Sequence, residues 1–192
     1  MIKTLPFYFF LILIFCCHNN TNKNNNSHNN HSTEFPSSAK NTLSPHKYAM
    51  ALVSDAHIHI DYSSPSVRGR IIFGGLVAYG EIWQSGANNA TWLETNKDLI
   101  FDGNLLKAGK YGFFTIPNKE KWTIIFNKNW EQHGKDEYNE EEDVLRFEVI
   151  PKISEDITEQ LVYRVQRSSN EDGKISLSWE KITISFPFSI AK

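Results

Sequence analysis

Cysteine is nearly absent from this chain of 192 residues, which carries only Cys16 and Cys17. The lack of a thiol after position 17 excludes a disulfide, a thiolate zinc site and a cysteine nucleophile from the remainder of the chain. That remainder does not need disulfides, because roughly 140 residues bury enough apolar surface to form a stable core.

A long hydrophobic run is missing as well. The most apolar stretch is 5–17, LPFYFFLILIFCC, and its 13 residues fall short of the ~20 that span a bilayer as a helix. Lys3 precedes the stretch, and polar residues follow it at once from His18. A basic start, a short apolar centre and an abrupt polar boundary are typical of a secretory signal peptide at 1–17, so we expect the protein to be exported.

The two adjacent cysteines resemble the lipidation site of bacterial lipoproteins. In that motif a branched aliphatic residue stands three positions before the cysteine, and a small residue stands directly before it. Cys17 fits with Ile14 and Cys16 in these places, whereas Cys16 follows the bulky Phe15. The resemblance implies a diacylated Cys17, or Cys16, that anchors the protein to the bacterial cell envelope, on its periplasmic face or at the cell surface. A plain secretory peptide and an uncleaved anchor are the alternatives.

Composition divides the rest of the chain in two. Residues 18–47 are rich in Asn, Ser, Thr and His and offer almost nothing to bury, so they are predicted to form a disordered tether. The histidines in the tether are irregularly spaced, which favours a solvated linker over a metal-binding tract. Residues 48–192 hold all five tryptophans and are predicted to form a single globular domain.

A strong excess of one charge is lacking in residues 48–192. This part has 16 Lys/Arg and 21 Asp/Glu, a net charge of −5. Moderate acidity without a basic stripe argues against nucleic acid and against anionic lipid as electrostatic partners. The six acids within 136–143 lack the glycine-punctuated ligand pattern of calcium loops, so we expect a solvated acidic loop there.

Strand patterns dominate residues 48–192. In 56–62, AHIHIDY, apolar and polar residues alternate strictly, which is typical of a half-buried strand. Turn dipeptides such as Asp102-Gly103 separate the later apolar segments. The fold is therefore predicted to be all-β, a jelly-roll or immunoglobulin-like β-sandwich or a related barrel, with one short helix around 76–84. Further strands are expected at 91–101, 104–106, 111–117, 122–128, 144–150, 161–166 and 174–184.

The segment 62–91, YSSPSVRGRIIFGGLVAYGEIWQSGANNAT, is densest in glycine, proline and aromatic residues. It resembles the uncharacterised bacterial family known as domain of unknown function 2911 (DUF2911). Members of that family carry Tyr-Ser-x-Pro-x-Val-basic-Gly-Arg, then Ile-Phe-Gly, Leu-Val-x-Tyr-Gly and Trp-x-x-Gly-Ala-Asn-x-Ala-Thr. Later segments such as 106–117 and 122–128 fit too, so the resemblance covers about residues 48–190. It implies an exported β-rich domain and no known activity.

This chain departs from the family pattern where relatives usually carry an Arg and a Glu. Gln84 and Asn89 stand at those two places, so a cation and a carboxylate are missing together. If the pair is functional in relatives, this chain has lost the function. If it is a structural ion pair, two neutral amides replace it, which buried ion pairs often tolerate.

The same segment combines planar aromatic faces with amide and guanidinium donors, the parts of a pocket that stacks on a ring and hydrogen-bonds its edges. We therefore predict a site for a small molecule or a glycan. The alternative is an ordered loop packed over one end of the sandwich, in which Trp83 plugs the core and Arg70 bonds carbonyl groups. The candidate ligand-binding residues are Tyr62, Arg70, Tyr79, Trp83, Asn88, Asn89, Thr91, Trp130 and His133.

Recognisable catalytic motifs are absent. There is no Gly-x-Ser-x-Gly, no His-Glu-x-x-His and no phosphate-binding glycine loop, although Asp61, Glu81 and Glu94 could supply a carboxylate pair for glycoside hydrolysis. His57, His59 and Asp61 share one strand face at a spacing that some zinc sites use. The wet face of a half-buried strand needs polar residues anyway, so we expect no metal and no cofactor.

The sequence thus favours an exported, membrane-anchored binding or envelope-interaction module without catalytic activity. A hydrolase of envelope or extracellular glycans or small molecules is one alternative, and a purely structural envelope scaffold is another. An enzyme should place a titratable group with a shifted pKa in the pocket of 62–91. A binding module should show stacked aromatic rings with neutral amides there, and a scaffold should bury Trp83 and Arg70 with all their hydrogen bonds internal.

Overall fold

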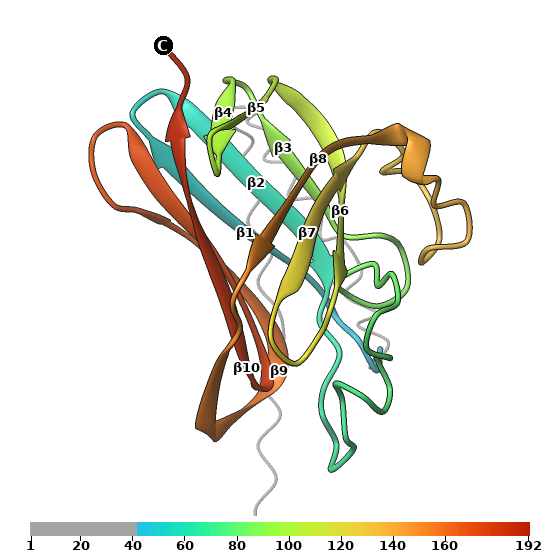
Figure 1. Ribbon diagram of the computed structural model, residues 1–192. Coiled ribbons are helices and arrows are strands. Elements are labelled where there is room, and N and C mark those ends of the chain that lie inside the picture. The colour runs from blue at the N-terminus through green and yellow to red at the C-terminus, as the bar shows by residue number, and fades with distance from the viewer. Residues whose placement is uncertain (1–41) are drawn as a thin grey trace, which may run out of the picture. The chain divides into compact units, whose positions relative to one another are not determined.

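The computed structural model describes residues 42–192 of the chain (Figure 1). The predicted signal peptide, both candidate lipidation cysteines and most of the predicted tether lie outside the described residues. Within 42–192 no helix is long and apolar enough to cross a membrane. The first strand begins at His46, slightly before the predicted start of the globular part at 48.

The described residues form two antiparallel sheets that face each other (Figure 1). The larger sheet has six strands in the order β1-β2-β3-β6-β7-β8, and the smaller has four in the order β5-β4-β10-β9. The predicted all-β sandwich is thereby confirmed. The elements are β1 (His46–Val53), β2 (Ala56–Ser63), β3 (Trp92–Thr95), β4 (Leu99–Phe101), β5 (Asn104–Leu106), β6 (Gly109–Ile116), β7 (Trp122–Asn127), the 3-10 helix η1 (Glu140–Glu142), β8 (Asp143–Val149), β9 (Lys152–Arg167) and β10 (Asp172–Ile190).

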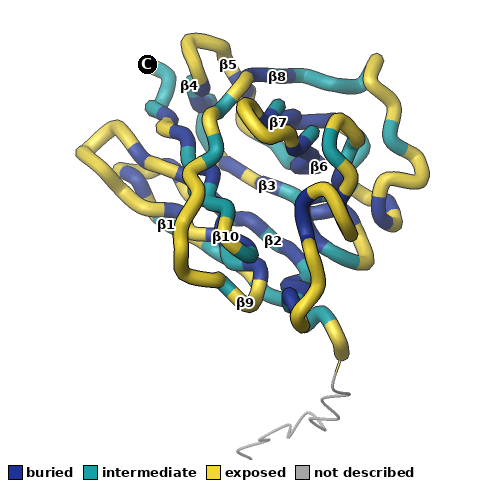
Figure 2. Tube along the Cα trace, turned by 60° about the horizontal axis from the view of Figure 1, so that its bottom comes forward, coloured by how far each residue is buried: buried dark blue, intermediate teal, exposed yellow. Residues whose placement is uncertain are grey.

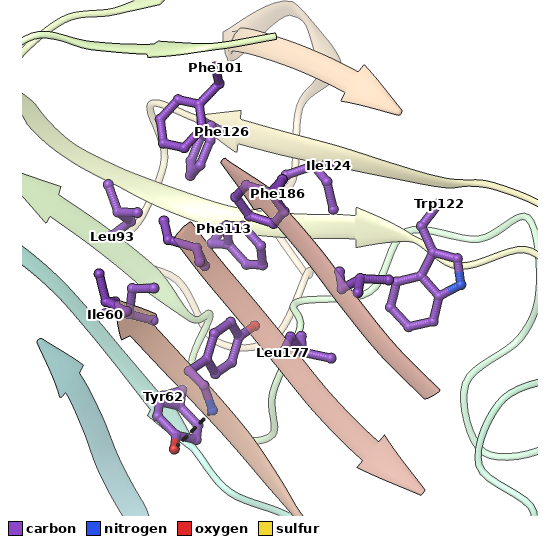
Figure 3. Close-up of a cluster of buried hydrophobic side chains, with 14 of the residues drawn as sticks. Ile60, Tyr62, Leu93, Phe101, Phe113, Trp122, Ile124, Phe126, Leu177 and Phe186 are labelled. Atoms are coloured by element: carbon purple, nitrogen blue, oxygen red, sulfur yellow. Dashed lines mark hydrogen bonds between the residues drawn. The ribbon is translucent and has the colours of Figure 1, made fainter. Parts of the chain in front are cut away.

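The core fills the space between the two sheets. The alternation predicted for 56–62 is confirmed, because Ile58, Ile60 and Tyr62 of β2 are buried while the residues between them are more exposed. Figure 3 shows Ile60 and Tyr62 in one buried cluster with aromatic residues of other strands, among them Phe113 of β6 and Phe186 of β10, whose ring centroids lie 6.2 Å apart. Buried residues alternate with exposed ones along most strands and are most continuous in β7 (Figure 2).

A long ordered loop joins β2 to β3 and links the two sheets. Near its start, the Val67 N–H donates to the carbonyl of Glu159 on β9 at 2.8 Å. Near its end, Trp83 and Thr115 of β6 exchange two backbone hydrogen bonds of 2.8 and 3.0 Å. Because the loop is tied to one strand of each sheet and sends Phe73 and Trp83 into the core, it is part of the folded structure.

The helix expected around 76–84 does not form. The Val77 N–H bonds the Ile72 carbonyl, and the Gly74 N–H bonds the Val77 carbonyl, both at 2.8 Å, which makes a tight turn with a bridge between neighbouring segments. Gly74 has a φ of +84°, and a Cβ at this position would lie 2.6 Å from the ring of Tyr79. The apolar residues of this segment therefore reach the core from turns, which the helical interpretation did not anticipate.

Candidate functional site

Three residues of the predicted site belong to the core. Tyr62, Trp83 and Thr91 are 4 %, 6 % and 0 % exposed. The Trp83 indole N–H donates to the Gly86 carbonyl at 3.0 Å, and the Thr91 hydroxyl donates to the Ser85 carbonyl at 3.1 Å. These side chains hold the loop in place, as the structural alternative expects.

Tyr62 and Tyr163 of β9 extend this buried network. The Tyr62 hydroxyl accepts a bond from the Tyr163 backbone N–H at 3.3 Å (Figure 3), and the Tyr163 hydroxyl donates to the Ser85 carbonyl at 2.7 Å. Burial raises the pKa of both phenols, and that of Tyr163 lies well above its ordinary value. Ser85 is itself fully buried in the left-handed backbone region, with a φ of +54°. Both tyrosines therefore serve as neutral hydrogen-bonding groups that position the loop.

Arg70 and Tyr79 also act locally. The Arg70 guanidinium is exposed and donates to the carbonyls of Val67 and Ser66 at 3.1 and 2.7 Å. Tyr79 is half-buried and covers the turn at Gly74. Carbonyl bonding by Arg70 matches the structural alternative, although its exposure differs from the burial expected of a pure scaffold.

The loop also forms a cavity of about 390 Å³, here called the loop cavity. The apolar part of the cavity wall is formed by Val77, Ile82 and the stacked pair Trp83 and Trp179, whose ring centroids lie 5.7 Å apart. The polar lining includes Gln84, Asn88, Glu81 and Lys135. The cavity thus combines aromatic and aliphatic surface with neutral amides, one ammonium group and one carboxylate.

Trp179 of β10, like Lys135, is a residue of this cavity that the sequence did not reveal. It is 1 % exposed, and its indole N–H has no hydrogen-bond partner among the described residues. Buried donors are nearly always paired in native proteins, and leaving one unpaired costs about 1–3 kcal/mol. The Trp179 ring lines the loop cavity, while its nitrogen is itself inaccessible.

The remaining predicted residues lie at a second hollow of about 370 Å³, here called the outer hollow, on the solvent side of the six-stranded sheet. Asn89, Trp130 and His133 line it together with Trp92 of β3. Asn89 and His133 form a backbone bridge, and His133 lies 3.2 Å from the carboxylate of Asp136. The structure therefore divides the single predicted site into two, because Asn88 belongs to the loop cavity and Asn89 to the outer hollow.

One connection, residues 128–142 between β7 and β8, supplies lining residues to both hollows. It is held by Tyr138, whose hydroxyl donates to the Asp143 carboxylate at 2.8 Å and accepts from Arg146 at 2.7 Å. Burial and the bond to Asp143 raise the pKa of Tyr138 to about 12. The connection thus places Lys135 at the loop cavity and Trp130 at the outer hollow.

The candidate metal ligands lie on the outer face of β2 but are engaged in other contacts. The His59 ring stacks between Tyr48 and Trp92, with centroids 5.7 and 5.1 Å away. The Asp61 carboxylate lies 2.8 Å from His46 Nε2 and 3.9 Å from His59 Nε2, while the His57 ring is 6.3 Å from that of His59. Within residues 42–192, no group of three or more His, Cys, Asp or Glu residues is arranged to hold a metal ion.

The three acids considered for glycoside hydrolysis are dispersed. Glu81 lines the loop cavity, whereas Asp61 and Glu94 stand on the outer faces of β2 and β3. Neither Asp61 nor Glu94 lines the loop cavity. The loop cavity therefore holds one of the three carboxylates, and a two-carboxylate mechanism there would need a second.

A family model described as "Protein of unknown function (DUF2911)" matches residues 44–188 of the chain. The match covers the two sheets and the loop that forms the cavity. No curated protein matches the chain, and no solved structure matches it.

Proposed function

Because the chain belongs to the DUF2911 family, whose description names no activity, we propose a function from the geometry of the loop cavity. The protein is an exported, membrane-anchored binding protein that holds a small molecule or a sugar ring in this cavity and does not transform it. The expected ligand is compact, with one apolar face and at least one carboxylate, carbonyl or hydroxyl acceptor. Export and anchoring rest on the signal-like segment 1–17 and its cysteines.

The observation that carries the proposal is the unpaired indole N–H of Trp179. It belongs to a cavity of about 390 Å³, and small-molecule sites in proteins commonly measure about 300–1,000 Å³. The Trp179 ring lines a space of ligand size and carries a buried donor without a partner, which supports a ligand that accepts the missing hydrogen bond after a shift of the ring exposes the nitrogen.

The lining supports binding rather than catalysis. Gln84 and Asn88 offer neutral amides, and Lys135 and Glu81 add one positive and one negative charge for a polar ligand. Asn88 has a φ of +60°, and its side chain amide donates to Ser63 at 3.2 Å, so the loop fixes its position before any ligand arrives. Such preformed polar groups around an apolar wall are typical of binding pockets.

A structural envelope scaffold is the second candidate. It is favoured by the buried, internally bonded Tyr62, Trp83 and Thr91, which make most of the loop architectural. The two candidates differ in what they assign to Trp179, since a scaffold gains nothing from an unpaired indole donor.

The test is thermal unfolding of the full-length chain in a polyoxyethylene detergent, in the presence of sugars, small carboxylates and nucleotides. A ligand at 100 times its dissociation constant adds ~2.7 kcal/mol to the stability, which raises Tm by several degrees. Trp179→Phe removes the donor and keeps an aromatic ring. Trp122→Phe is the matched control, because Trp122 belongs to the same aromatic cluster but does not line the cavity.

We expect at least one compound class to raise Tm of the parent and of Trp122→Phe, with a smaller rise in Trp179→Phe. An unchanged Tm with every compound, in variants that all fold, would instead favour the scaffold.

A further inference from the structure

Trp92 and Trp130 hold a cation that belongs to the chain itself. The Lys110 ammonium nitrogen lies 3.5 Å from the ring centroid of Trp92 and 3.5 Å from that of Trp130. The two centroids are 6.2 Å apart, and the ring planes are inclined at 67°. The indoles therefore form a V, and the ammonium group sits between them at cation–π distance.

Strand register explains how the V arises. β3 and β6 pair so that Trp92 lies opposite Gly112 and Glu94 lies opposite Lys110, which puts Trp92 and Lys110 on the same outer face. A Cβ on Gly112 would lie 2.9 Å from the Asn129 carbonyl and 3.3 Å from Trp130 Cα. The missing side chain thus lets the 128–142 connection approach the sheet and bring Trp130 beside Trp92.

A stacked aromatic ring supports Trp92, and the flexible side chain of Lys110 fills the space between the two indoles. His59 of β2 stacks on Trp92 with an interplanar angle of 11°, and Tyr48 stacks in turn on His59. Since β3 lies between β2 and β6, His59 and Lys110 approach Trp92 from opposite sides. The two rings are therefore held in place before a ligand binds. The flexible four-carbon stem of Lys110, in contrast, can move its ammonium group out of the space between them.

The outer hollow beside the V is acidic. Its lining includes the carboxylate residues Glu131 and Glu137 with the two indoles, and no Lys or Arg is part of it. Indole faces combined with carboxylates are the chemistry that attracts organic cations. A flat platform for sugar rings is not formed at Trp92, because His59 and Lys110 occupy its two sides.

We propose that Trp92 and Trp130 form a binding site for an organic ammonium group of the choline type, and that Lys110 occupies this site while no ligand is bound. The ligand replaces the Lys110 ammonium between the indoles and takes its counter-charge from Glu131 and Glu137. The displaced Lys110 has Glu94 as its cross-strand neighbour on β3. The site is separate from the loop cavity, so it does not depend on the proposed function.

The test is an NMR titration that follows the indole N–H resonances of the full-length chain in the same detergent. Choline and tetramethylammonium are compared with 3,3-dimethyl-1-butanol, which has the shape of choline but no charge. The two cations should shift the Trp92 and Trp130 resonances, and the neutral isostere should not.

Lys110→Met keeps the stem and removes the competing charge, so it should bind choline about fivefold more tightly. Lys174→Met, an exposed lysine of the β9–β10 hairpin, is the matched control and should bind like the parent.

Trp130→Ala should lose the response to choline. The proposal is overturned if choline and its neutral isostere act alike, or if Lys110→Met keeps a native spectrum and Tm but shows no response to either cation. A response to sugars in place of cations would also overturn it and would assign the outer hollow to a neutral ligand.

Discussion

Trp83 and Trp179 stack with ring centroids 5.7 Å apart, but their indole N–H groups are in opposite situations. Trp83 donates to the Gly86 carbonyl at 3.0 Å, while the Trp179 donor has no acceptor among residues 42–192. Two neighbouring residues of the same type thus differ in one hydrogen bond. The Trp83 donor holds the loop in place, and the Trp179 donor is buried without a partner among these residues.

This difference predicts unequal costs for the same substitution. Trp83→Phe leaves the buried Gly86 carbonyl without its donor, whereas Trp179→Phe removes a donor that had no partner. We expect Trp83→Phe to lose about 1–3 kcal/mol more unfolding free energy than Trp179→Phe, as measured by urea denaturation without ligand. Equal losses would mean that the Trp179 N–H is satisfied, and the argument for the loop cavity would fail.

The anchor predicted from the sequence can be tested by acyl labelling. Cys17→Ala should abolish incorporation of labelled palmitate, because it removes the residue with the better lipoprotein context. Cys16→Ala should retain incorporation, since alanine is an equally small neighbour at the position before Cys17. Labelling that survives Cys17→Ala and disappears in Cys16→Ala would move the modification to Cys16. Labelling that survives in the double variant would exclude a cysteine-linked anchor.

The fold class could be predicted from the sequence because it depends on local patterns. The period-2 alternation of 56–62 and turn signals such as Asp102-Gly103 mark strands without knowledge of their partners. The helix predicted around 76–84 does not form, because two glycines with left-handed backbone angles, φ of +84° at Gly74 and +76° at Gly80, put this part of the loop into turns. The buried Val77 and Trp83 therefore reach the core from turns.

The site was only partly predictable because it depends on which strands are neighbours. Trp83 and Asn88 were recognised from their own segment, but Trp179 comes from β10, about ninety residues later in the chain. Trp92 was not predicted as a site residue for a similar reason, because it contacts His59 on β2 and Lys110 on β6. Long-range register brings these residues together, and no single-sequence pattern encodes it.

Alkaline pH should weaken the fold through its buried phenols. Burial raises the pKa of Tyr163 well above its ordinary value, and burial with the bond to Asp143 raises that of Tyr138 to about 12. An unfolded tyrosine ionises near pH ~10, so above that pH the unfolded chain binds fewer protons than the folded one. The unfolding free energy is therefore unaffected by these groups below pH ~10 and falls as the pH rises further.

The measurement is the urea midpoint between pH 9 and 11.5. Tyr138→Phe removes one of the phenols whose pKa is raised by folding. The urea midpoint of this variant should therefore fall less steeply with pH than that of the parent protein. The ionisation of lysines contributes equally to both proteins and cancels in the comparison. Identical slopes would show that Tyr138 ionises alike in the folded and unfolded states.

Gly112 should be a sensitive position for the outer face, because a side chain there would press against the connection that carries Trp130. In Gly112→Ala, the new Cβ would meet the Asn129 carbonyl at 2.9 Å and the Phe114 ring at 2.7 Å. We expect a loss of about 1–3 kcal/mol of unfolding free energy, the usual cost of overpacking, and a red-shifted tryptophan emission as Trp130 becomes more exposed to solvent.

Gly103→Ala is the control, since its Cβ would meet nothing within 4 Å and only its φ of +77° is unfavourable. It should lower stability without shifting the emission. If Gly112→Ala retains the parent emission, the connection closes over the sheet without help from the glycine, and the V between the two indoles does not depend on it.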